Sequence, residues 1–159
     1  MTDDRTSIDD FFKALKGSPF VMIGIDDTPD HSEPMTAQIA DGVTDTLWFF
    51  TGRDNRIAIG GPAMAQFAAK GHDFFACVHG TLTPENDPAM LEKLWSNQVA
   101  AWFPGGKDDP NLLLLRYDLE SAEMWEADVS LTGMVKMMFG GTIKPQEVGD
   151  HAEVTMRTA

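Results

Sequence analysis

The 159-residue chain contains a single cysteine, Cys77, and only 12 Lys plus Arg against 25 Asp plus Glu. One thiol cannot form a disulfide within the chain, which suits a reducing compartment such as the cytoplasm. The formal net charge of −13 disfavours nucleic acid and membrane surfaces as partners, because both are polyanionic. Since positive charge is scarce, any local cluster of arginines is informative.

Long apolar runs are also missing. No stretch approaches the roughly 20 apolar residues of a membrane span, and the first residues lack the basic start and apolar run of a signal peptide. We therefore expect a soluble cytoplasmic protein. The length fits one domain covering residues 1–159, and an apolar fraction of 43% is ordinary for a globular chain.

Several chemical motifs are absent as well. The sequence has no P-loop, no Gly-x-Gly-x-x-Gly and no Gly-x-Ser-x-Gly elbow. The histidines, at positions 31, 72, 79 and 151, have no recognised ligand spacing, so we expect no metal site. Cys77 lies in an apolar segment and is interpreted as a small buried hydrophobe. Catalytic residues stay unassigned.

The remaining pattern is mainly β. A short amphipathic helix is expected from an N-cap at Ser7 to Gly17. Apolar segments bounded by turn residues predict strands at 19–25, 35–40, 47–51, 64–70, 74–82, 112–117, 122–126 and 152–156. Helical segments are expected near 55–59, 88–101 and 129–139. Short connections favour a six- to seven-stranded antiparallel sheet closed into a barrel, with a few short helices.

Three of these strands carry apolar residues without clean alternation: residues 20–25, 47–50 and 112–115. An antiparallel strand with one wet face should alternate, so we expect both faces to be covered. One face can fill the barrel, whereas the other needs a partner surface. This pattern predicts a homodimer.

The stretch LWFFTGRDNR, residues 47–56, places two of the few arginines at the end of an apolar segment. Arg53 and Arg56 offer charged forks that match phosphate oxygens, and Thr51 and Asn55 add polar groups. This combination predicts an anion site. The alternative is that the arginines are two solvated charges in a loop.

A second unusual stretch is the aromatic pair Trp102-Phe103, which lies in a Pro/Gly-rich loop. Such a pair can cover a flat ligand or a partner chain. It can equally well plug one end of the barrel.

In order along the chain, the segments SEPMTAQ (32–38), LWFFTGRDNR (47–56), VHGTLTPENDPAMLEKLW (78–95), WFPGGKDDPNLLLLR (102–116) and AEMWEA (122–127) resemble the general stress protein branch of the pyridoxamine 5′-phosphate oxidase-like flavoproteins. The resemblance runs from about residue 6 to 156. It implies a split β-barrel of Greek-key type that binds FMN, and a homodimer with the flavin at the interface. It also implies a flavin-dependent oxidoreductase of unknown substrate with a stress-related role, exchanging electrons with a nicotinamide or another small redox substrate.

The resemblance also implies which residues meet the cofactor. One strand would line the isoalloxazine ring, the end of the next would touch the flavin, the positions after it would hold the phosphate, and an aromatic loop would lie near the flavin of the other subunit. These four groups are, in turn, Met35, Thr36 and Ala37; Phe50 and Thr51; Asn55 and Arg56; and Trp102 with Phe103. Arg53, from the anion site predicted above, is expected to bind the cofactor with them.

Two positions depart from the family pattern. Glu33 stands where relatives often have arginine, which replaces a phosphate partner with a like charge, and Arg56 stands where lysine is common. Two alternatives to an enzyme therefore remain open. One is a flavin-binding or storage protein without turnover. The other is a barrel that has lost FMN and acts as an interaction module, a reading that Glu33 favours.

Overall fold

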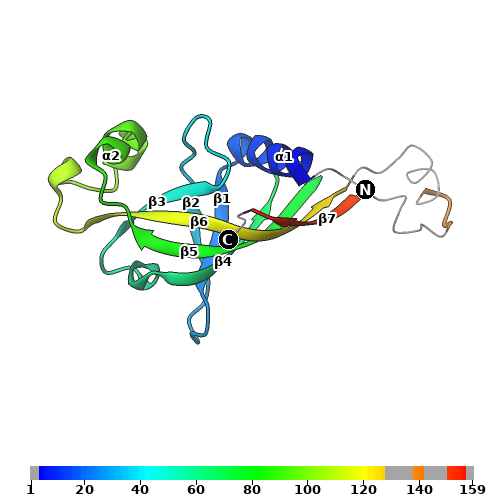
Figure 1. Cartoon of the computed structure of the whole chain (residues 1–159), viewed down its shortest axis with the longest axis horizontal. Coiled ribbons are helices and arrows are strands. Elements are labelled where there is room, and N and C mark those ends of the chain that lie inside the picture. Colours follow the sequence, from blue (N-terminus) through cyan, green and yellow to red (C-terminus); the bar gives the residue numbers. More distant parts are fainter. Residues whose placement is uncertain (1–3, 128–137, 142–149, 157–159) are drawn as a thin grey trace.

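The computed structural model describes residues 4–127, 138–141 and 150–156 (Figure 1). One long helix precedes a set of seven strands, and shorter helical turns connect some of them. In chain order these elements are α1 (Asp4–Gly17), β1 (Phe20–Ile25), β2 (Glu33–Thr36), β3 (Thr46–Gly52), η1 (Arg56–Ile59), β4 (Gly61–Ala68), β5 (Phe74–Pro84), α2 (Pro88–Leu94), α3 (Asn97–Ala100), η2 (Gly106–Asp108), β6 (Leu112–Glu126) and β7 (Asp150–Thr155).

The strands form one antiparallel sheet in the order β2-β1-β4-β5-β6-β3, with β7 added beside β6. The two end strands, β2 and β3, approach each other across a seam that carries little pairing. Just after β2, the Gln38 N–H donates to the Trp48 carbonyl at 2.8 Å, and the Trp48 N–H donates back at 3.1 Å. The sheet is therefore curled but not closed, and the predicted split barrel is confirmed.

The inner face of the sheet carries the main core. Alternate residues of β1, β4 and β5 point inward, and α1 covers them with Phe11, Phe12 and Leu15. In Figure 1, α1 lies over the half of the sheet where β6 pairs with β7, whereas α2 lies at the end where β6 begins. The predicted N-cap was wrong: α1 begins at Asp4, and Ser7 is a buried residue inside it.

The largest error in the strand predictions concerns β6, which is a single strand of 15 residues and not two. Its register with β5 shifts between His79 and Gly80, so Glu120 is an extra residue in a β-bulge. A Cβ on Gly80 would collide with the Asp118 carbonyl oxygen and would also lie 2.9 Å from the Tyr117 ring. The polar residues that suggested a break therefore mark a bulge.

Other elements differ in detail. β2 is shorter than the predicted strand at residues 35–40 and begins at Glu33. The predicted helix at 88–101 is broken at Trp95, and the Ser96 hydroxyl caps α3 by accepting from the Val99 N–H at 3.3 Å. Most of the predicted helix at 129–139 lies outside the described residues. No helix in the described ranges is long and apolar enough to cross a membrane.

We expect three strands to be buried on both faces of the sheet, and this holds for β3 and for the start of β6. There the inward residues meet the main core, while Trp48, Leu114 and Leu94 form a second cluster beneath α2. The expectation fails for β1, which alternates: Phe20 and Met22 are 61% and 42% exposed, whereas Val21 and Ile23 are buried. An apolar outer face thus remains on this part of the sheet.

Candidate functional site

The tip of β3 has the predicted local structure. The strand ends at Gly52 and a turn leads to Asn55, whose side-chain oxygen accepts the Ile57 N–H at 2.9 Å and so caps the 3₁₀ turn η1. Gly60, with φ of 70°, closes η1, a conformation that glycine adopts without strain. The apolar strand, the cap and the glycine therefore place Arg53 and Arg56 at one corner of the sheet.

Glu33 of β2 contacts two of the predicted phosphate-binding residues, Asn55 and Arg56. Its Oε1 lies 2.9 Å from Nε of Arg56, and its Oε2 accepts a hydrogen bond of 2.6 Å from Nδ2 of Asn55. The Arg56 guanidinium also donates from NH1 to the His31 carbonyl at 3.0 Å. Asn55, Arg56 and Glu33 thus form one charge-paired group across the seam between β2 and β3.

Arg53 lies in different surroundings from Arg56. Its backbone N–H donates to the carbonyl and to the side-chain oxygen of Asn111, at 2.9 and 3.0 Å. Within the described residues its guanidinium has no hydrogen bond or ion pair. It borders a pocket of ≈ 250 Å³ whose other charged lining residues are Lys107, Glu85, Asp108 and Asp109. Arg53 is therefore the freer cation of the two.

Phe50 and Thr51 are neighbours on β3 and point to opposite faces of the sheet. Phe50 meets Trp95 edge to face, with ring centroids 5.8 Å apart, and shares a cluster with Phe103. Thr51 is buried on the other face. The side chains of this predicted pair therefore cannot form one continuous surface.

The predicted aromatic pair in the loop also separates. Phe103 is buried against Val99 and Leu112, whereas Trp102 is 83% exposed. Phe103 thus packs beside α3, in a cluster separate from the main core. Trp102 is free to meet a ligand or another chain.

The predicted ring-lining residues lie on and just after β2. Met35 is partly buried against the main core, Thr36 is exposed, and Ala37 is buried with its N–H donating to the Pro19 carbonyl at 2.7 Å. Met35 and Glu33 share one face of β2 because they are two residues apart. The predicted site residues thus fall into two groups, one around Glu33 and one around Phe50 and the pocket.

His79 has more partners than the sequence suggested. Its Nε2 lies 2.8 Å from Oδ2 of Asp26, and its Nδ1 lies 3.3 Å from Oε2 of Glu120. Thr81 donates to the other oxygen of Glu120 at 2.6 Å. Glu120 is the extra residue of the β-bulge, so the bulge turns this carboxylate toward the imidazole. No sequence spacing could reveal this contact, because the three partners come from separate segments.

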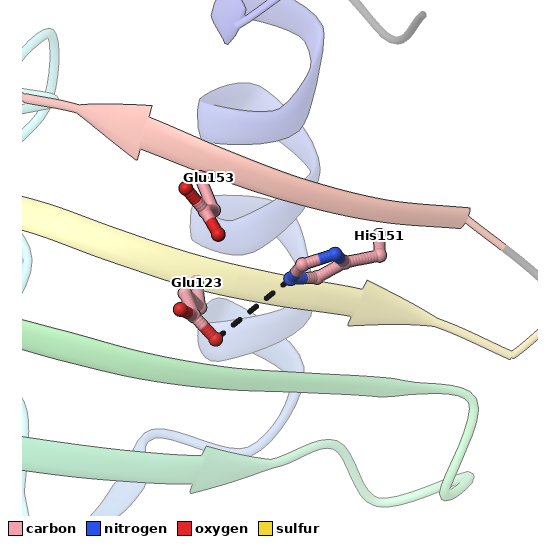
Figure 2. A group of neighbouring side chains, drawn as sticks. All are labelled: Glu123, His151 and Glu153. Carbon is pink, nitrogen blue, oxygen red and sulfur yellow. Dashed lines mark ion pairs between the residues drawn. The ribbon is translucent and has the colours of Figure 1, made fainter.

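A second histidine cluster lies on β6 and β7. Figure 2 shows Glu123, His151 and Glu153 converging on the face of the sheet away from α1. His151 Nε2 lies 3.7 Å from Oε2 of Glu123, and potential ligand atoms of all three lie within 4.8 Å of one another. Two carboxylates and an imidazole suit a divalent cation. The three residues are exposed, and the spacing analysis missed them because two strands supply them.

Cys77 is half-buried next to this cluster, opposite Glu123 in the β5–β6 ladder. Partial burial raises the pKa of the Cys77 thiol, and the negative charge of Glu123 raises it further. A thiol with a raised pKa is a poor nucleophile at neutral pH. The geometry therefore favours the interpretation of Cys77 as a structural residue.

Comparisons with known proteins agree on one family. The family model described as "Pyridoxamine 5'-phosphate oxidase like" matches residues 6–148. General stress protein 26 of Bacillus subtilis (strain 168) is 34% identical over 55 residues, which is 35% of this chain and only 39% of that protein. The match thus spans about two fifths of the curated relative.

Solved structures extend the match to most of the chain. The general stress FMN/FAD binding protein from Xanthomonas citri is 45% identical, with a TM-score of 0.73 over 80% of this chain and 93% of that one. A structure named after general stress protein 26 from Jannaschia sp. CCS1 has a TM-score of 0.79 at 24% identity, covering 96% and 99% of the two chains. The latter likeness supports the fold alone.

Proposed function

Because the chain belongs to the pyridoxamine 5′-phosphate oxidase-like family, in its general stress protein branch, we propose that it binds FMN and serves as a flavin-dependent oxidoreductase. The observation that carries this proposal is the pair of arginines, Arg53 and Arg56, at the corner after β3, in a chain of net charge −13. The name of the Xanthomonas citri relative, which is 45% identical, includes FMN/FAD binding.

The donor groups at this corner fit a phosphate. Arg53 offers a guanidinium without a side-chain partner in the described ranges. Arg56 uses two of its five N–H groups, on Glu33 and on the His31 carbonyl, which leaves 5 − 2 = 3. Arginine forks match phosphate oxygens well. Glu33 is the feature that opposes the fit, since it brings a negative charge to the same place.

The flavin ring would lie along β2 and the end of β3. A bound flavin supplies hydride or electron transfer, and the protein supplies binding, orientation and electrostatics. Arg53 and Arg56 would fix the ligand by its phosphate and so hold the ring at a set depth. The second substrate would be a nicotinamide or another small redox compound.

We further propose that the protein is a homodimer with a flavin at the interface. The outer face carries a row of apolar side chains: Phe20 on β1, then Phe75 on β5, which is opposite Trp125 on β6. These residues are between 38% and 61% exposed. Patches of this kind mark interaction surfaces, and a second copy offers the same patch by two-fold symmetry. The exposed Trp102 would then reach the flavin of the partner subunit.

One observation favours a second candidate, a barrel that has lost FMN and works as an interaction module. Glu33 already balances the charge of Arg56 and accepts from Asn55, so part of this corner is paired without a ligand. The two candidates differ in a simple experiment. Freshly purified oxidoreductase should show flavin absorption that bleaches when NADH or NADPH is added without oxygen. A protein that shows the absorption but is not bleached is a binder without turnover for these donors, and one that neither carries nor takes up flavin is the interaction module.

A further inference from the structure

Glu33 reaches the corner from the opposite side of the seam. It is the first residue of β2, at one end of the sheet order, whereas Asn55 and Arg56 follow β3, at the other end. Its side chain is only 25% exposed. The contacts of 2.9 Å to Arg56 and 2.6 Å to Asn55 use both carboxylate oxygens. The geometry is that of an anion bound to two donors.

These contacts engage the Asn55 amide and two of the five Arg56 N–H groups. The Asn55 amide is engaged at both ends, because its oxygen accepts from Ile57 and its nitrogen donates to Glu33. The positive charge of Arg56 is balanced by the carboxylate. A ligand phosphate that sought the same donors would meet an acceptor already in place and a like charge beside it.

We propose that Glu33 is a specificity-determining residue of the flavin site, acting as a built-in carboxylate that competes with the ligand phosphate for Asn55 and Arg56. This inference rests on the proposed function and adds a direction of selectivity to it. Glu33 weakens the binding of flavins that carry a phosphate and leaves the binding of the uncharged ring system unchanged. The chain should therefore discriminate less between FMN and riboflavin than the same site without this carboxylate.

A purely structural role for Glu33 gives a different expectation. In that role Glu33 would only hold β2 near η1, and its loss would weaken the binding of every flavin by the same factor. Glu33→Gln separates the two roles, because glutamine keeps the length and an acceptor oxygen but loses the charge. Asp41→Asn, in the exposed turn after β2, is the matched control with the same change of charge.

The experiment is a fluorescence titration of flavin-free wild type, Glu33→Gln and Asp41→Asn with FMN and with riboflavin. We expect Glu33→Gln to lower the dissociation constant of FMN by about tenfold or more, with riboflavin unchanged and the control like wild type. An unchanged or weaker affinity for FMN would overturn the inference. So would an equal gain for both flavins.

Failure of the proposed function looks different. If no variant binds either flavin, the flavin site is refuted, and inorganic phosphate then tests the corner by itself in thermal unfolding. A rise of Tm with phosphate in Glu33→Gln and not in wild type supports competition by Glu33. Equal responses of the two proteins overturn it.

Discussion

Glu33 and Arg56 form an ion pair of 2.9 Å that joins the two ends of the curled sheet, β2 and the turn after β3. Among the described residues, one isolated backbone bridge, between Gln38 just after β2 and Trp48 of β3, links the same two sides of the sheet elsewhere. This pair therefore lies at the point where the sheet is open and next to the corner that carries Arg53 and Arg56. Its charge balance decides what the corner can bind.

Reversing the charge of Arg56 should remove FMN and spare riboflavin. Arg56→Glu places two carboxylates together and deletes a charge-assisted bond worth ~1.5–3 kcal/mol, so the dissociation constant of FMN should rise more than tenfold. Arg53→Glu should cost at least as much, since Arg53 is the freer cation. Lys70→Glu, in an exposed turn, is the control. Equal losses for FMN and riboflavin in titrations would show that the arginines do not hold the phosphate.

The outer face should control the oligomeric state. Light scattering coupled to size exclusion is expected to give 2 × 17.5 = 35 kDa for the wild type. Phe20→Asp introduces a charge into an apolar contact and should shift the protein toward 17.5 kDa. Lys13→Asp, on the exposed side of α1, should stay dimeric. A wild-type monomer that retains its full flavin would contradict a shared site.

Tyr117 should contribute to the stability of the folded protein and should make that stability fall at alkaline pH. Its hydroxyl lies 2.7 Å from the Val78 carbonyl and 2.9 Å from that of Ala63, fully inside the barrel. Tyr117→Phe should lower the free energy of unfolding by about 1 kcal/mol, the usual net value of a hydrogen bond. Chemical denaturation at neutral pH measures this difference.

The pH dependence follows from the ionisation of the same hydroxyl. Burial raises the pKa of Tyr117 above its ordinary value of 10, and Asp26 adds to the effect. Since the pKa is raised in the folded state, the stabilisation is complete below pH 10 and is lost as the pH rises toward the folded-state pKa. The stability of wild type should fall above pH 10 more steeply than that of Tyr117→Phe. Parallel curves for the two proteins would refute the assignment.

Replacing Gly80, which lies at the β-bulge between the paired strands β5 and β6, should destabilise the protein. Gly80→Ala puts a methyl group against backbone and ring atoms of β6, and such overpacking costs about 1–3 kcal/mol. Gly17→Ala is a matched control, because a Cβ there meets nothing within 4 Å. Urea denaturation of both variants compares them. Equal stabilities would show that the bulge relaxes freely.

The corner after β3 could be predicted from sequence because every part of it is local. An apolar strand, the capping side chain of Asn55 and the glycine at position 60 act over a few residues. The ion pair with Glu33 could not be predicted from spacing, since it depends on how the curled sheet brings β2 toward η1. The same limit explains the cluster around His151, whose ligand atoms come from two strands 28 positions apart.

The length of β6 shows a related limit. The polar residues around Glu120 look like a turn when read alone, and they pair as a strand only because Gly80 lets β6 pass close to β5. The exposed side chain of Phe20 illustrates the opposite case. Its apolar character was visible in the sequence, but which face of the sheet it occupies depends on the register of β1.

Whether the chain binds FMN is tested most sharply by titrating the flavin-free wild type with FMN and following flavin fluorescence. We expect quenching that saturates at one FMN per chain, with a dissociation constant in the micromolar range or lower. A colourless preparation whose addition leaves FMN fluorescence unchanged, under conditions where the protein is folded, would contradict it.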